Sequence, residues 1–258
     1  EPVARSAVVP SVAMRVVDRR IHRPHDVCGS PPEGRDEPDA SACAPAPYEG
    51  APVTADEAVR EAVAPAIEAA RGVRERRVGF RAETAIRTRY REESALTNLV
   101  ADMMRAATPN TDVALMNSGG VRTDLAAGDL DYGTLYSVLP FDNRLVTVRM
   151  RGSALREVLA HNAAGDSGTV AVSGVRAAAT CEGGRVSVRV TRDDGRAVGD
   201  DDVLTVATND YMALGALERH LVEPLSDAVM AASPVLRDAV GDALARAAAA
   251  RGEDARWY

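Results

Sequence analysis

Apolar positions recur along the chain at two different spacings, and these spacings predict where helices and strands lie. Over 93–107 the apolar residues fall three or four positions apart, which is typical of one buried helix face. The continuous apolar run at 111–117 is typical of a buried strand, whereas 143–152 alternates like a strand with one solvated face. The helical period returns at 153–163. Further strand-like runs lie at 76–86, 169–174, 175–180, 185–192 and 203–210.

Helices and strands therefore mix along most of the chain, and some of the strands follow one another as hairpins do. This mixture predicts an α/β (α+β mixed) domain with mixed sheets flanked by helices. A last helix is predicted over 233–250. We expect it to begin with Ser233 as its N-terminal cap and Pro234 as its first helical residue.

The composition changes towards the N-terminus. Residues 24–52 hold seven of the fourteen prolines, as a linker or a surface excursion would. We expect three parts: residues 1–53, a connector helix over 54–75, and a domain over 76–258. The first twenty residues lack the basic and apolar regions of a signal peptide and read like the middle of a protein. The sequence is therefore expected to be a piece of a longer chain.

Three cysteines carry a prediction about compartment. Cys28 and Cys43 flank an irregular segment, and a disulfide closing a loop of that length stabilises a fold by about 3 kcal/mol. One interpretation is a Cys28–Cys43 disulfide in an exported protein; the other is two unrelated thiols. Cys181 lies between predicted strands, where we expect a small buried residue.

Charge and composition exclude several classes of function. The net charge of -7 disfavours a nucleic-acid or anionic-membrane surface, and no apolar run approaches the roughly 18 residues of a membrane helix. His22 and His25 lack a second matched pair of metal ligands, so we interpret them as surface histidines and predict no metal site. A phosphate-binding glycine loop and a nucleophile motif are also missing from the sequence.

Three segments hold the candidate binding residues. The first follows a predicted buried strand as Asn-Ser-Gly-Gly-Val-Arg, where the glycines allow close backbone approach and Arg122 is either an anion ligand or a surface ion-pair partner. Aromatic residues make up only 3% of the chain, so Phe141 and Tyr211 stand out at predicted strand ends. Their rings either stack against a flat ligand or fill the core.

Four segments in this order resemble a known family: "ESALTNLVADMM", "ALMNSGGVR", "GTLYSVLPFDNRLVTVRMRGSALREVL" and "VLTVATNDYMALG". They resemble the C-terminal domain of the 5′-nucleotidase family, which includes bacterial UDP-sugar hydrolases and 2′,3′-cyclic-nucleotide phosphodiesterases. The resemblance covers roughly residues 76 to 250. Residues 1–53, with their cysteine-bearing insert, resemble the tail of the metallophosphoesterase domain that precedes it in that family.

The resemblance implies a nucleotide or nucleoside as the ligand, with its base between two aromatic rings. The substrate-binding residues that it implies are Asn117, Gly119, Gly120, Arg122, Phe141, Asn143 and Tyr211, with Arg89 added if the alignment shifts by one residue at Tyr90. Hydrolysis would take place in the metallophosphoesterase domain, which binds two divalent metal ions in such enzymes. The motifs of that domain are not in these residues, so no cofactor and no catalytic residue is expected here.

One departure from the family pattern leaves the function open. The family has Gly-Gly-Asp-Gly after its second aromatic residue, and its aspartate contacts the ribose; this sequence has Gly215, Ala216, Leu217 and Glu218 there. The main hypothesis is the substrate-recognition domain of an exported phosphohydrolase (periplasmic, cell-surface or extracellular) that works with its metallophosphoesterase domain. The alternatives are a non-catalytic binding or scaffold domain that has lost nucleotide binding, and a relative acting on a sulfur-containing substrate.

Overall fold

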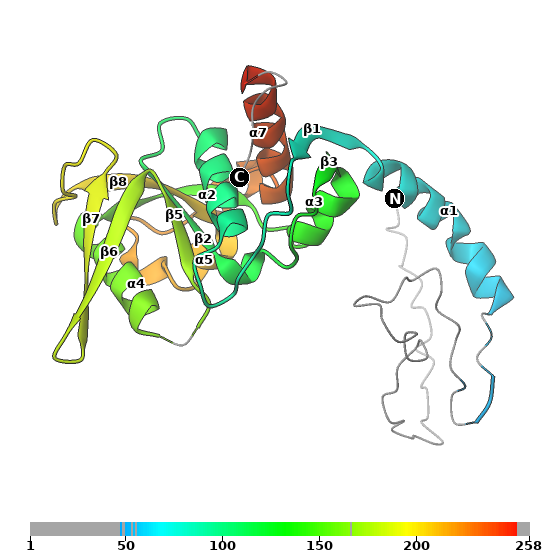
Figure 1. Ribbon diagram of the computed structural model, residues 1–258, viewed down its shortest axis with the longest axis horizontal. Helices are drawn as coiled ribbons and strands as arrows, with labels where there is room; N and C mark the ends of the chain where they lie inside the picture. Colours follow the sequence, from blue (N-terminus) through cyan, green and yellow to red (C-terminus); the bar gives the residue numbers. More distant parts are fainter. Residues whose placement is uncertain (1–46, 48–49, 53, 55, 166, 252–258) are drawn as a thin grey trace, which may run out of the picture. The chain divides into compact units, whose positions relative to one another are not determined.

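A computed structural model describes residues 47, 50–52, 54, 56–165 and 167–251 of the chain. Two compact units divide the chain, Glu1–Pro65 and Ala66–Tyr258. All strands of the described residues belong to the second unit (Figure 1). The predicted disulfide partners Cys28 and Cys43, and the histidines His22 and His25, lie outside the described residues.

The predicted elements occur in the predicted order, and the structure adds a strand at 128–131 and helices at 132–138, 210–214 and 227–232. The strands are β1 (Arg77–Ala82), β2 (Val113–Asn117), β3 (Gly128–Asp131), β4 (Leu145–Arg151), β5 (Val170–Ser173), β6 (Val175–Glu182), β7 (Arg185–Arg192) and β8 (Val203–Asn209). The helices are α1 (Glu57–Arg74), α2 (Ala95–Ala107), α3 (Tyr132–Val138), α4 (Gly152–Ala164), α5 (Asp210–Leu214), α6 (Asp227–Ala232) and α7 (Leu236–Arg251), with short 3₁₀ turns η2 (Ser118–Gly120) and η3 (Glu218–His220). The prediction of a mixed α/β fold is confirmed. None of the helices in these described ranges is both long enough and apolar enough to cross a bilayer.

The central sheet has the strand order β4-β8-β2-β5. β2 and β8 run parallel, whereas β4 pairs with β8 and β5 pairs with β2 in antiparallel registers, so the sheet is mixed. The parallel pairing brings the last residues of β2 and β8 to the same edge of the sheet, although Val113 and its partner Val206 are far apart in the sequence. Two smaller antiparallel sheets, β1-β3 and β6-β7, complete the strands.

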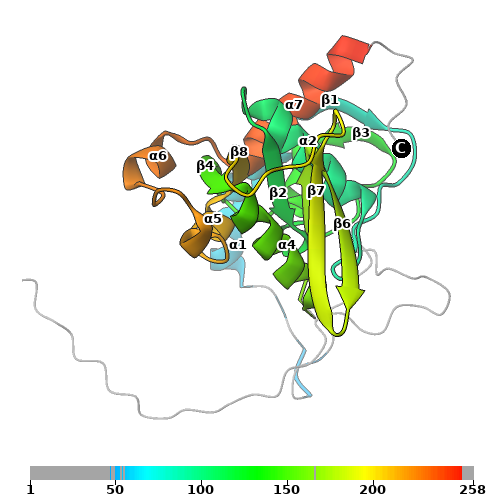
Figure 2. The same cartoon turned by 90° about the vertical axis from the view of Figure 1, so that its left-hand side faces the viewer.

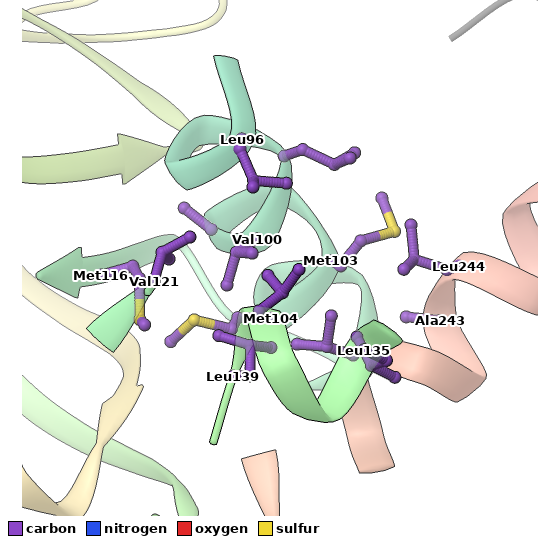
Figure 3. Close-up of a cluster of buried hydrophobic side chains, with 14 of the residues drawn as sticks. Leu96, Val100, Met103, Met104, Met116, Val121, Leu135, Leu139, Ala243 and Leu244 are labelled. Atoms are coloured by element: carbon purple, nitrogen blue, oxygen red, sulfur yellow. The ribbon is translucent and has the colours of Figure 1, made fainter. Parts of the chain in front are cut away.

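Both faces of the central sheet are buried, which explains why β2 reads as a continuous apolar run. Ala114 and Met116 belong to a core with α2, α3 and α7, and Val113 and Leu115 belong to a second core with α4, β4, β7 and β8. Figure 3 shows the first core, where Met103 and Met104 of α2 lie among side chains from the other elements. Two layers of helices thus hold the ends of β2 and β8 in place.

The last helix begins later than predicted. Ser233 ends α6, where its hydroxyl donates to the carbonyl of Val229 at 2.8 Å, and α7 starts only at Leu236. The reason is tertiary: the amide of Leu145 donates to the carbonyl of Pro234, and the amide of Leu236 donates to that of Asn143. This pairing with the start of β4 keeps 234–235 extended, so the prediction of a Ser233 cap and a Pro234 first turn is wrong.

The prediction that Cys181 is buried is also wrong, since its side chain is exposed and its thiol is free. Seven consecutive residues of β6, 176–182, are exposed. Figure 2 shows β7 between α4 and β6, so α4 covers the inner strand of this hairpin and leaves most of the outer one uncovered.

Candidate ligand-binding site

The loop that follows β2 is held in a tight turn. Ser118–Gly120 form the 3₁₀ turn η2, and the amide of Ser118 donates to the carbonyl of Thr169 at 2.8 Å. A Cβ atom on Gly120 would lie 2.5 Å from Cε of Met116. A side chain at position 120 would therefore force the end of the Met116 side chain to move, and Gly119 and Gly120 both line a pocket.

The two aromatic residues singled out in the sequence are exposed rather than in the core. Phe141 lies in the loop between α3 and β4 with 48% of its surface exposed, and Tyr211 lies in the first turn of α5 with 70% exposed. The alternative that both rings fill the core is wrong.

Asp210 joins the segments that carry these rings. Its Oδ1 accepts a hydrogen bond from Nδ2 of Asn143 at 2.8 Å and another from the amide of Tyr211 at 2.9 Å. The amide of Asp210 in turn donates to the carbonyl of Arg144 at 3.0 Å. The start of β4 and the start of α5 are thus fixed to each other, two residues from Phe141 and next to Tyr211.

Asn209 connects the end of β2 to the start of α5 in a similar way. Its Nδ2 donates to Oδ1 of Asn117 at 2.9 Å, and its Oδ1 accepts the amide of Met212 at 2.8 Å, which caps α5. Asn209 is buried. Its side chain thus joins the last residues of β2 and β8, which the parallel pairing brings together.

These segments surround an open pocket of about 830 Å³, within the range of roughly 300–1,000 Å³ typical of small-ligand sites. Six of the eight predicted binding residues line it together: Asn117, Gly119, Gly120, Phe141, Asn143 and Tyr211. Its other lining residues are Tyr90, Ser118, Asp142, Asn162, Ser167, Gly168, Val170, Met212, Gly215 and Ala216.

The two predicted arginines are not among the lining residues. Arg122 is exposed and its Nη1 lies 3.4 Å from the carbonyl oxygen of Gly119, to which it donates. Its backbone amide donates to the carbonyl of Val138 at 2.9 Å. Arg89 is exposed too, and its Nη1 donates to the carbonyl of the adjacent Thr88. Both guanidinium groups lie outside the pocket wall in this conformation.

Tyr90 supplies a third aromatic ring that the sequence did not single out for binding. Its side chain is 55% exposed, and its carbonyl accepts hydrogen bonds from the Ser118 hydroxyl at 2.7 Å and the Thr169 amide at 2.9 Å. A Cβ atom on Gly168 would lie 2.7 Å from the Tyr90 ring. The scarcity of aromatic residues was the signal that could have found it, since Tyr90 lies in a loop as Phe141 does.

Only the first half of segment 215–218, which departs from the family pattern, lines the pocket. Gly215 and Ala216 line it, whereas the side chain of Leu217 is fully buried in the second core. Glu218 lies in the 3₁₀ turn η3 and is not a lining residue. No carboxylate from these four positions therefore faces the pocket.

A buried arginine of α7 holds the Phe141 loop by hydrogen bonds. Arg237 of α7 is only 5% exposed, and it donates to the carbonyls of Leu139 at 2.9 Å and Phe141 at 3.3 Å and to Oδ1 of Asp142 at 2.8 Å. Burial alone would lower the pKa of Arg237, but hydrogen bonds with Tyr132 and Asp142 outweigh it and raise the pKa above its ordinary value. The side chain is thus a permanent cation that neutralises Asp142.

No group of three His, Cys, Asp or Glu side chains able to hold a metal ion occurs in the described part of the chain.

The chain matches one protein family. The family model described as "5'-nucleotidase, C-terminal domain" matches residues 71–221. Among curated proteins, the chain is 36% identical over 122 residues to Endonuclease YhcR of Bacillus subtilis, covering 47% of this chain and 10% of that protein. It is 35% identical over 120 residues to Protein UshA of Yersinia enterocolitica, covering 45% of this chain and 20% of that protein. The chain thus spans a small part of the curated relatives that it matches.

Solved structures give the same result. The structure of a 5'-nucleotidase precursor from Thermus thermophilus superposes with a TM-score of 0.61 and 26% identity, covering 77% of this chain and 42% of that one. The predicted resemblance to this fold is therefore confirmed in three dimensions.

Proposed function

The chain belongs to the 5′-nucleotidase C-terminal domain family, and from that premise we propose that its pocket binds the nucleoside part of a nucleotide. The observation that carries the proposal is the pocket between Phe141 and Tyr211, two exposed aromatic residues that come from separate segments and line the same space. Stacking of a base on an aromatic ring is worth about 1–3 kcal/mol. The amides of Asn117 and Asn143 supply polar groups at the wall.

We propose that hydrolysis takes place in a metallophosphoesterase domain of a longer protein. Two divalent metal ions bound in that domain would supply polarisation of the phosphoryl group and activation of water, and the domain described here would position the rest of the substrate. We further propose an exported protein with a Cys28–Cys43 disulfide. The observation behind this proposal is that Cys28 and Cys43 flank an irregular segment of the sequence.

Calorimetric titration of the 258-residue chain with adenosine, AMP and ribose 5-phosphate tests the proposal. Adenosine and AMP are expected to bind, whereas ribose 5-phosphate, which lacks a base, is expected to bind at least about tenfold more weakly because about 1–3 kcal/mol of stacking is missing. Phe141→Ala and Tyr211→Ala should each weaken AMP binding by about tenfold. Leu214→Ala is the matched control, because Leu214 is an exposed apolar residue of the same helix that does not line the pocket.

A second candidate function is a non-catalytic binding or scaffold domain. It is favoured by the buried Leu217 and by the apolar lining at Gly215 and Ala216, because the segment then offers no carboxylate to ribose hydroxyls. Equal, weak affinity for all three ligands, or AMP binding that is unchanged in both ring variants, would reject nucleoside binding in this pocket and support the second candidate.

A further inference from the structure

The outer strand of the β6-β7 hairpin has an open edge. β6 pairs with β7 along eight registered positions without a bulge, and no backbone hydrogen bond among the described residues reaches its other edge. The far edge of β7, in contrast, is partly covered, since the amide of Val198 donates to the carbonyl of Val190 at 3.0 Å. An uncovered edge of this kind is a template for pairing with another strand.

The sequence of β6 carries none of the features that usually block such pairing. Its central residues, 177–181, are Ala-Ala-Ala-Thr-Cys, without proline or charge, and all are exposed. Natural edge strands are commonly protected by charged residues, prolines or bulges at these positions. Small side chains on both faces also let a second strand approach without steric conflict.

The positions of the charged residues in β6 indicate which strand could pair with its open edge. Its only charged residues are Arg176 and Glu182, placed symmetrically about Ala179. Neither forms an ion pair with another residue that the structure describes. We propose that two copies of this chain dimerise by antiparallel pairing of their β6 edges about a two-fold axis at Ala179.

This register places Arg176 directly opposite Glu182 of the second copy, and the symmetry makes the same ion pair again at the other end. Directly opposed side chains in antiparallel strands have Cβ atoms about 4.5–5.5 Å apart, so both pairs can form. Centring the pairing on Ala178 would put Arg176 opposite Thr180, and centring it on Thr180 would put Glu182 opposite Ala178. The register at Ala179 alone satisfies both charges. The result is a continuous four-stranded sheet across the dimer.

Charge reversal gives a sharp test by sedimentation velocity of the 258-residue chain at micromolar to millimolar concentration. The wild-type chain should dimerise reversibly. Arg176→Glu and Glu182→Arg should each weaken the dimer by at least about tenfold, because each variant sets like charges opposite each other at both ends. The double variant Arg176→Glu/Glu182→Arg should dimerise again.

Mixing the two single variants excludes misfolding as the cause. A heterodimer of the Arg176→Glu and Glu182→Arg chains has opposite charges at both ends, so the mixture should dimerise although each variant alone does not. A wild-type chain that stays monomeric up to millimolar concentration would overturn the proposal. So would a dimer that tolerates both single reversals, because its interface would then lie elsewhere.

Cross-linking tests the register itself. The proposed pairing sets Ala177 opposite Cys181 of the second copy, at a Cα separation within the range that a disulfide spans. Under mild oxidation, Ala177→Cys should give an intermolecular disulfide between position 177 and Cys181, identified by peptide mapping. Ala178→Cys is the control, since that position lies on the opposite face of the strand and should not reach Cys181. Equal cross-linking by both variants would contradict the register.

Discussion

Arg237 donates a hydrogen bond to the carbonyl oxygen of Phe141 at 3.3 Å, so a residue of the last helix supports the loop that presents an aromatic ring to the pocket. The same guanidinium also binds the carbonyl of Leu139 and the carboxylate of Asp142. Its plane lies over Tyr136 as well, with Cζ 4.3 Å from the ring centroid. The position of Phe141 is therefore set by a buried network and not by the loop alone.

Arg237→Met should destabilise the fold by about 2–4 kcal/mol, because it leaves the buried carbonyl of Leu139 and the partly buried carbonyl of Phe141 without this donor. Urea unfolding at 25 °C measures the change. Arg149→Met is the control: Arg149 is an exposed arginine, and its replacement should change the free energy of unfolding by about 0.5 kcal/mol or less. A similar small change at Arg237 would mean that the network contributes little.

Asn209→Ala should cost about 1–3 kcal/mol of stability, because the variant loses the cap of α5 and leaves Oδ1 of Asn117 without its donor. It should also weaken ligand binding, since Tyr211 is in the helix that Asn209 caps. Thermal unfolding and titration report the two effects separately. Asn98→Ala removes an exposed hydrogen bond to Glu93 instead and should leave both unchanged within error.

Two glycines with positive φ give a paired test of steric conflict. At Gly174 φ is +84° and a Cβ atom would lie 2.2 Å from the carbonyl oxygen of Asp112, whereas at Gly183 φ is +56° and nothing lies within 4 Å. Gly183→Ala should cost about 1–2 kcal/mol, the strain of the left-handed conformation. Gly174→Ala should cost at least about 1 kcal/mol more, because the backbone must also move. Equal losses in chemical denaturation would contradict this.

Asp131 gives a prediction about pH. Its Oδ1 accepts the amide of Thr134 at 2.7 Å and caps α3, and hydrogen bonding to the backbone and side chain of Thr134 lowers the pKa of Asp131 below its usual value. Because the folded-state pKa is the lower one, the stabilisation is fully present above the unfolded-state pKa of about 3.9 and is lost as the pH falls towards the folded-state pKa.

Asp131→Ala should therefore lower stability by about 1 kcal/mol at pH 7, and the difference from wild type should shrink below about pH 4. Unfolding measured from pH 7 to pH 2 tests this. Asp131→Ser keeps a cap without the titrating group, so its stability relative to Asp131→Ala should not vary with pH. A constant difference between wild type and Asp131→Ala would show that the carboxylate charge has no role.

Local patterns predicted the elements well where burial is regular. The helical spacing over 93–107 and the apolar run at 111–117 correspond to α2 and β2, because both face the core along their length. The same reasoning failed for Ser233 and Pro234, whose cap-like sequence is overridden by pairing with residues of the β4 segment. Such a contact between distant parts of the chain cannot be predicted from the local spacing of residues.

The site residues, too, were predicted where a local signal exists and missed where only long-range contacts define them. Phe141 and Tyr211 were singled out because each lies at a predicted strand end, Asn117 was added by the family resemblance, and the structure brings all three to one pocket. Tyr90 and Arg237 were missed, since one reaches the pocket from an irregular loop and the other supports it from a helix with an ordinary surface pattern. Their contributions depend on long-range contacts that spacing does not encode.

The parallel pairing of β2 with β8 also has a kinetic consequence. The hydroxyl of Thr208 donates to the carbonyl of Leu115 across a separation of 93 residues, and contacts that close so long a loop form slowly during folding. Both walls of the pocket are attached to these two strands, so a partly folded chain has no pocket. The rate at which ligand affinity returns during refolding therefore measures the rate at which β2 pairs with β8.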